Sequence, residues 1–197
     1  MLDIHQRRGI MNSPSSAGPY FDASLDILKQ ISKTVGNCQQ TVNAYIADGQ
    51  AMSFWCNGFR ASLELAVIFS HKILLEQNLH AFIISNNLID AIRVDFDYNF
   101  NNIFSLIHPT FSKRATPIHR YGKLKVHIVA PIDIVLMKLT RFSEGDREDI
   151  KELISRGLVD PGQLIELAYG AVDDYVGNLE PFKNTLKIIL NWFSSLE

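Results

Sequence analysis

Three acidic side chains at alternating strand positions are the candidates for metal chemistry in this chain of 197 residues. Glu64 lies in a run from Ser62 to Phe69, and Asp95 and Asp97 lie in a second run. Because side chains at i and i+2 of a strand point to one face, this spacing presents carboxylates together. Paired carboxylates can hold Mg²⁺ against nucleotide phosphates. The residue two positions after Glu64 is Ala66, so this strand offers one carboxylate where two are needed.

Four alternating segments are expected to form the strands that position these residues. The segment 62–69 places Leu63, Leu65, Val67 and Phe69 on one face and its polar positions on the other. Residues 93–97 repeat the pattern, with Arg93, Asp95 and Asp97 on one face. Residues 42–47 and 124–129 are the other two predicted strands.

Helical periodicity and end signals predict a largely helical second half. Gly145 is expected to break the chain before one helix, and Asp160 has the position of an N-cap at the start of the next. The predicted helices cover residues 21–35, 50–57, 131–142, 146–156, about 161–176 and 181–193. We therefore predict an α/β (α+β) fold, with a mobile segment 1–20, a core with a small mixed sheet and flanking helices over 21–130, and a helical part 131–197 of the same domain.

Composition is that of an ordinary globular protein, with 47% hydrophobic and 20% charged residues and a net charge of −2. No apolar run is long enough to span a bilayer, and the first residues contain no apolar segment of a secretory signal. Cys38 and Cys56 are too few for a disulfide framework or a CxxC zinc site. We expect a cytoplasmic protein that does not interact with membranes.

Three regions taken in order resemble bacterial nucleotidyltransferase-like proteins related to the AbiEii-type toxin family. The first comprises YIADGQA at 45–51 and RASLELA at 60–66, where the family has a Gly-Gly turn and then Arg-x-[Ser/Thr]-x-Asp-[Ile/Val]-Asp. The second comprises VDFDYNFN at 94–101 with LIHP at 106–109. The third comprises VHIVAPIDIVLMKLTR at 126–141 and DRED at 146–149. The resemblance covers roughly residues 25–190, and its first region is degraded.

The resemblance implies roles in nucleotide binding for five residues. Gly49 matches the second glycine of the turn, Arg60 and Ser62 match the family's Arg and Ser/Thr, and Lys138 matches a lysine near the phosphates. Arg141 lies one turn after Lys138 on the same face. Asp48 stands where the family has the first glycine, and a carboxylate there would repel phosphate.

The resemblance also implies catalytic and metal-binding carboxylates, with Mg²⁺ as cofactor and a nucleoside triphosphate as substrate. Glu64 matches the first metal aspartate, and Asp97 is the candidate for the third carboxylate, which would act on the attacking hydroxyl. Asp95 would replace the missing ligand if its strand lies beside that of Glu64. Asp149 matches the family aspartate of the following helix.

Each of these residues also has a purely structural interpretation. Glu64 is compatible with a solvated position on a half-exposed strand, and Asp95 and Asp97 with a strand end. Lys138 on an apolar helix is typical of a surface residue whose ammonium reaches water. Asp146 and Asp149 are placed to stabilise a helix start, which we favour over catalysis for Asp146.

Two functional hypotheses follow. The first is a nucleotidyltransferase-fold protein of a toxin–antitoxin or defence-type system. It would have weak or lost NMP transfer, and it would act by binding an antitoxin, another protein or nucleic acid. The alternative is an active Mg²⁺-dependent nucleotidyltransferase that modifies RNA or protein through a rebuilt site containing Glu64, Asp95 or Asp97, Lys138 and Asp149.

Overall fold

Two sheets organise the protein, whose computed structural model describes residues 17–75, 77–84, 91–100, 106–173, 175 and 178–194. The first sheet has the order β3-β1-β7-β6, and the second has the order β2-β5-β4. Parallel pairs occur between β1 and β7 and between β2 and β5, and the remaining pairs are antiparallel. The strands are β1 (Val42–Ile46), β2 (Glu64–Leu65), β3 (Val67–Phe69), β4 (His80–Ile83), β5 (Ile92–Phe96), β6 (Thr116–Tyr121) and β7 (Leu124–Ile128).

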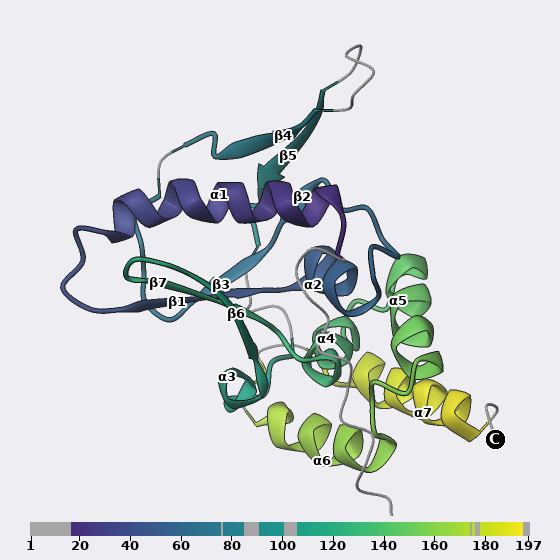
Figure 1. Ribbon diagram of the computed structural model, residues 1–197. Coiled ribbons are helices and arrows are strands. Elements are labelled where there is room, and N and C mark those ends of the chain that lie inside the picture. The colour runs from purple at the N-terminus through teal and green to yellow at the C-terminus, as the bar shows by residue number, and fades with distance from the viewer. Residues whose placement is uncertain are drawn as a thin grey trace, which may run out of the picture.

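The helices surround these sheets unevenly. Figure 1 shows α1 lying across the strands on one side, with α4, α5, α6 and α7 gathered on the other side and the β4–β5 hairpin projecting from the body. Helix α1 packs against β4 and β5, and α2 packs against α4. The helices are α1 (Pro19–Val35), α2 (Asp48–Trp55), α3 (Phe111–Arg114), α4 (Pro131–Lys138), α5 (Glu144–Ser155), α6 (Pro161–Val172) and α7 (Glu180–Ser194).

The amphipathic pattern of α1 explains how the core closes. Phe21, Ile27, Leu28, Ile31 and Val35 recur at helical spacing and are all buried. They join the inward faces of the strands and of α4 in one hydrophobic cluster. The predicted α/β (α+β) fold with a mixed sheet and flanking helices is therefore confirmed, although the strands divide between two sheets.

The segment predicted as one strand from Ser62 to Phe69 is in fact two strands. Residues 64–65 pair with β5, whereas residues 67–69 pair with β1. Ala66 lies between them, and its carbonyl accepts a hydrogen bond from Ala47 N at 3.0 Å. The predicted alternation of faces was wrong because the chain changes sheets here: Leu63 is exposed, and residues 65–68 are all buried.

The helix boundaries correct two further expectations and confirm a third. Helix α2 begins at Asp48 itself rather than after a turn at 48–49. Gly145 lies inside α5 rather than before it, and the N-cap is Ser143. Asp160 caps α6 as predicted, accepting from Gln163 N at 2.7 Å. Among the described residues, no helix is long and apolar enough to cross a membrane.

Candidate functional site

The corner between α4 and α5 builds one side of a charged cluster. Lys138 is the last residue of α4, and Ser143 starts α5 with a capping box. The Ser143 hydroxyl accepts from Asp146 N at 3.2 Å, and Ser143 N donates to Asp146 Oδ2 at 2.9 Å. Asp149 follows three residues later on the same helix face. Both aspartates therefore point back toward the end of α4.

Asp48 completes the cluster from the opposite side. It is the first residue of α2, separated from the end of β1 by Ala47, and its φ is +50°. Few residues other than glycine adopt this left-handed region, because the Cβ approaches the backbone. The backbone conformation thus suits the glycine expected here from the family pattern, although the side chain is a carboxylate.

Lys138 lies at the centre of the three carboxylates. Its Nζ is 2.6 Å from Asp48 Oδ1, 3.0 Å from Asp146 Oδ1 and 2.9 Å from Asp149 Oδ2. The Lys138 side chain is only 3% exposed. The alternative interpretation of Lys138 as a surface residue whose ammonium reaches water is therefore wrong, and its predicted role in nucleotide binding stays a prediction. Asp149 Oδ2 is buried and accepts no hydrogen bond of good geometry, so its contact with the ammonium is an ion pair only.

Two arginines close the cluster at its edges. Arg141 donates to Asp146 Oδ2 and Oδ1 at 2.8 and 2.6 Å, and its NH2 lies 3.4 Å from Asp48 Oδ2. Arg60 donates to Asp149 Oδ1 at 2.7 Å and to the carbonyl of Gly145 at 3.1 Å. Three carboxylates are thus matched by three cations, and the cluster has no formal net charge.

The ion pairs keep these groups charged despite their burial. Burial alone disfavours the charged form of Asp48, but the Lys138 ammonium holds the pKa of Asp48 below its usual value. Burial also acts on Asp146, yet its hydrogen bonds from Arg141 and the charge of Lys138 lower its pKa well below the ordinary range. Burial opposes the charge of Lys138, but the carboxylates of Asp48 and Asp149 raise its pKa.

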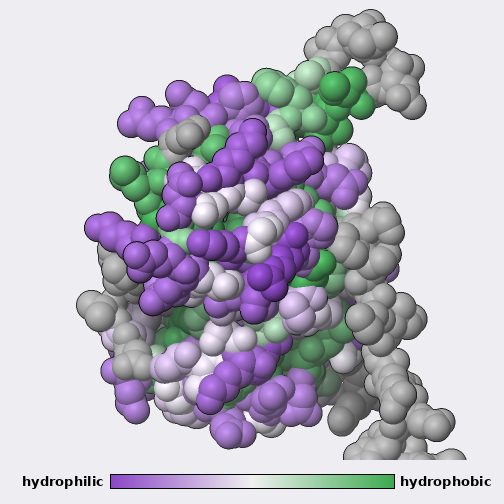
Figure 2. Space-filling view, turned by 60° about the vertical axis from the view of Figure 1, so that its left-hand side comes forward, coloured by the Kyte–Doolittle hydropathy of each residue, from purple (hydrophilic) through white to green (hydrophobic). Residues whose placement is uncertain are grey.

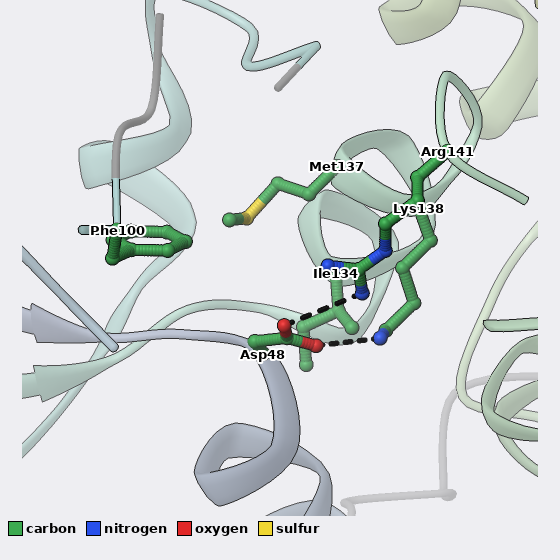
Figure 3. Close-up of a pocket in the computed structure, with 6 residues that line it drawn as sticks. All are labelled: Asp48, Phe100, Ile134, Met137, Lys138 and Arg141. Carbon is green, nitrogen blue, oxygen red and sulfur yellow. Dashed lines mark hydrogen bonds and ion pairs between the residues drawn. The ribbon is translucent and has the colours of Figure 1, made fainter. Parts of the chain in front are cut away.

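A small cavity opens beside the cluster. It has a volume of about 20 Å³ and is lined by Asp48, Phe100, Ile134, Met137, Lys138 and Arg141. Figure 3 shows Asp48 reaching toward Lys138 and Arg141, with Phe100 and Met137 on the other side of the space. A volume of about 15–30 Å³ holds one water molecule. The described conformation therefore has no room here for a nucleotide.

The cluster does not fit a magnesium ion. Asp48, Asp146 and Asp149 form the one group in the described part of the chain in which three or more potential ligand atoms from His, Cys, Asp or Glu lie within 4.8 Å of one another. Lys138 Nζ already lies within 3.0 Å of an oxygen of each carboxylate. Mg²⁺ needs oxygens at about 2.0–2.1 Å, and an ammonium at the same place would repel it.

The predicted metal ligands lie on the second sheet, outside this cluster. Glu64 is exposed on β2 and is the register partner of Asp95 on β5, so the strands are adjacent as the rebuilt site requires. Asp95 Oδ1 forms an ion pair with Arg93 NH2 at 2.6 Å, and Asp97 Oδ1 accepts a hydrogen bond from Asn99 N at 2.8 Å. None of the three acids is ion-paired with Lys138.

Gly49 packs closely against Ser62, and this contact accounts for the glycine without a bound nucleotide. A Cβ on Gly49 would lie 2.8 Å from Ser62 Oγ and 2.9 Å from its Cβ. The start of α2 therefore approaches the segment before β2 too closely for any side chain at position 49. Ser62 Oγ donates to the Glu64 carbonyl at 2.9 Å, which fixes the same segment.

Of the predicted site residues, the structure brings together Arg60, Lys138, Arg141 and Asp149, and it adds Asp48 and Asp146 to them. Sequence reasoning assigned Asp146 only to the helix start. That role is present, because Asp146 belongs to the capping box, but its carboxylate also binds both Lys138 and Arg141. The spacing Ser143-x-x-Asp146 was the available signal for the cap.

A comparison with protein-family models matches residues 66–195 to a family described as nucleotidyltransferase of unknown function (DUF6036). The match covers more than half of the chain, and the protein belongs to this family. It includes Lys138, Arg141, Asp146 and Asp149, and it begins after Asp48 and Glu64. No curated protein and no solved structure gives a significant match.

Proposed function

We propose that this member of a nucleotidyltransferase family acts by binding a partner protein or nucleic acid, with weak or no transfer of nucleotides. The observation that carries the proposal is the position of Lys138, which is buried among three carboxylates. Transfer of a nucleotide depends on cations and metal ions that neutralise the phosphates. A lysine held by Asp48, Asp146 and Asp149 does not supply that charge.

The metal strand supports the same conclusion. Ala66 stands at the position of the second ligand, and its methyl group offers no oxygen to a metal. Its backbone carbonyl is already bonded to Ala47 N. Glu64 is left as the single carboxylate of that strand.

An apolar surface on the projecting hairpin supports the binding role. Phe82 and Ile84 are 51% and 75% exposed, and Ile92 is also exposed on the neighbouring strand. Figure 2 shows hydrophobic side chains gathered at this end of the molecule. Exposed apolar side chains that cluster are typical of protein interfaces. We propose a protein partner of the antitoxin kind for this surface, with RNA as the alternative partner.

The transfer hypothesis is tested by incubating the purified protein with Mg²⁺, each labelled nucleoside triphosphate, and RNA or protein acceptors. We expect no more labelled acceptor than with Glu64→Ala. Robust Mg²⁺-dependent incorporation that Glu64→Ala abolishes would overturn the proposal.

The binding role is tested by co-expression with the product of the adjacent gene. Phe82→Ser with Ile84→Ser should abolish co-purification, whereas Leu74→Ser, which alters a more exposed apolar residue outside β4 and β5, should not. Equal retention in both variants would exclude the hairpin as the binding surface.

One observation favours the alternative of an active enzyme with a rebuilt acidic site. Glu64 and Asp95 are register partners on parallel strands, and Asp97 N donates to Leu65 O, which places Asp97 next to the position of Ala66. Asp97 would then supply the carboxylate that Ala66 lacks. This alternative predicts that Asp95→Asn or Asp97→Asn abolishes any measured incorporation.

A further inference from the structure

Asp48 has a different relation to the cluster from the other two carboxylates. Asp146 and Asp149 have side chains that are 1% and 0% exposed, whereas that of Asp48 is 30% exposed. Asp146 is fixed by Ser143 and Arg141, and Asp149 by Arg60. Among the described residues, the Asp48 carboxylate is held by Lys138 and Arg141 alone, so it can leave the cluster without disturbing a helix cap.

We propose that the Asp48 carboxylate is an internal anion occupying a phosphate-sized site between Lys138 and Arg141, from which a phosphate group can displace it. This inference rests on the proposed function, because it explains how the cations of the nucleotidyltransferase scaffold are kept from nucleotides. Besides the missing metal ligand at Ala66, it identifies the Asp48 carboxylate on α2 as a group that competes with phosphate for Lys138 and Arg141.

The charges of the cluster define what this site binds once Asp48 has moved. In the described part of the chain, Lys138, Arg141 and Arg60 then face Asp146 and Asp149 alone, which leaves one positive charge in excess. The apolar side chains of Phe100, Ile134 and Met137 border the space and reduce its screening by water. An anion at this place therefore replaces the charge that Asp48 supplies.

The small size of the cavity favours a phosphate group over a larger ligand. The cavity of about 20 Å³ gains the space of one carboxylate when Asp48 moves, so we expect it to take a phosphoryl group and to leave a sugar or base outside. Arg141 is 58% exposed and its guanidinium can bind two phosphate oxygens, while Lys138 supplies a point charge. The class of ligand is a terminal phosphate monoester, bound without a metal ion, with the rest of its molecule outside the cavity.

The test is calorimetric titration with inorganic pyrophosphate, in the absence of Mg²⁺ and at low salt, of the wild type, Asp48→Asn and Asp48→Gly. Both substitutions suit a backbone with φ of +50°, since asparagine and glycine tolerate this region, and circular dichroism checks that each variant is folded. We expect each variant to bind at least about tenfold more tightly than the wild type, because a nearby like charge is removed.

Glu148→Gln is the matched control, because it removes one negative charge from an exposed position of the same helix that carries Asp146 and Asp149. It should bind like the wild type. The double variant with Asp48→Asn and Lys138→Met should bind pyrophosphate no more tightly than the wild type. Equal binding by wild type and both Asp48 variants, a gain in Glu148→Gln, or a gain that survives loss of Lys138 would each overturn the inference.

The source of the phosphate is distinguished by replacing pyrophosphate with ATP or with a short RNA carrying a 5′-phosphate or a 5′-hydroxyl. Tighter binding of the 5′-phosphorylated RNA identifies an RNA end, and tighter binding of ATP identifies a nucleotide. These measurements involve no transfer reaction, so their outcome is independent of the incorporation assay. Nucleotide transfer by the wild type would refute the proposed function. Unchanged phosphate affinity on loss of Asp48 would refute the present inference.

Discussion

Replacing Lys138 by methionine is expected to be the most destabilising single change in the cluster. Methionine preserves the unbranched shape of the side chain but removes an ammonium that lies 2.6–3.0 Å from three carboxylates. Two of those carboxylates are buried, and Arg60 and Arg141 neutralise them only from the edge. Breaking a buried ion pair by deleting one partner costs about 3–5 kcal/mol. A domain of this size then melts roughly 6–20 °C lower.

The pH dependence separates this mechanism from simple loss of packing. Lys138 is one of the charges that hold the pKa values of Asp48 and Asp146 below the ordinary value of 3.8, so its removal brings both closer to the values of the unfolded chain. In the wild type this contribution to stability is present above pH 3.8 and is lost as the pH falls through the lower folded-state values. We therefore expect the deficit of the variant to stay level above about pH 5 and to shrink as the pH falls below 3.8.

Urea unfolding followed by circular dichroism at about pH 7, 4 and 3 measures both quantities. Lys29→Met, an exposed lysine on α1, controls for loss of a charge and should change the free energy of unfolding by less than about 0.5 kcal/mol. A loss below about 1 kcal/mol for Lys138→Met, or a deficit that stays constant with pH, would refute the role given to the ammonium.

Three further predictions concern the same region and the core beneath it. Gly49→Ala should lower the free energy of unfolding by about 1–3 kcal/mol, measured by urea unfolding, because its Cβ would overlap Ser62, and Ser62→Gly should restore part of the loss. Asp146→Asn should be less stable than wild type at pH 7. The difference should disappear only as the pH falls below 3.8, because the folded-state pKa of Asp146 is lowered and its contribution is lost on protonation. Burial raises the pKa of Cys56 to about 11, so a thiol reagent at pH 8 should modify Cys38 first and Cys56 only on unfolding.

Local patterns predicted the helices well because their signals lie within a few residues. Asp160 with Gln163 predicted the start of α6, and the apolar spacing from Phe21 to Val35 predicted α1. Gly145 misled the prediction of α5, since a glycine in the first turn is tolerated where Ser143 and Asp146 form a capping box. The hydrogen bonds of the capping box stabilise the start of α5 by more than Gly145 costs in conformational entropy.

The site could be predicted only in part, because its contacts join residues far apart in the chain. Lys138 meets Asp48 across 90 positions, and no local pattern reports such a pairing. An isolated lysine on an apolar helix is more often at the surface, and only the three carboxylates around it explain its burial. The change of sheet at Ala66 was equally invisible, since alternation reports the faces of a strand but not which neighbour it pairs with.

The passage of one short segment through both sheets has a consequence for the cooperativity of unfolding. Residues 64–69 pair with β5 at one end and with β1 at the other, and the two halves meet at Ala66 without an intervening loop. The amide of Ala47, which bonds to Ala66 O, belongs to the residue directly before Asp48. Separation of the three-stranded sheet therefore pulls on β3 and on the start of α2 at once. We therefore expect the two sheets to unfold as one cooperative unit, with hydrogen exchange at the Ala47 amide reporting the opening of both.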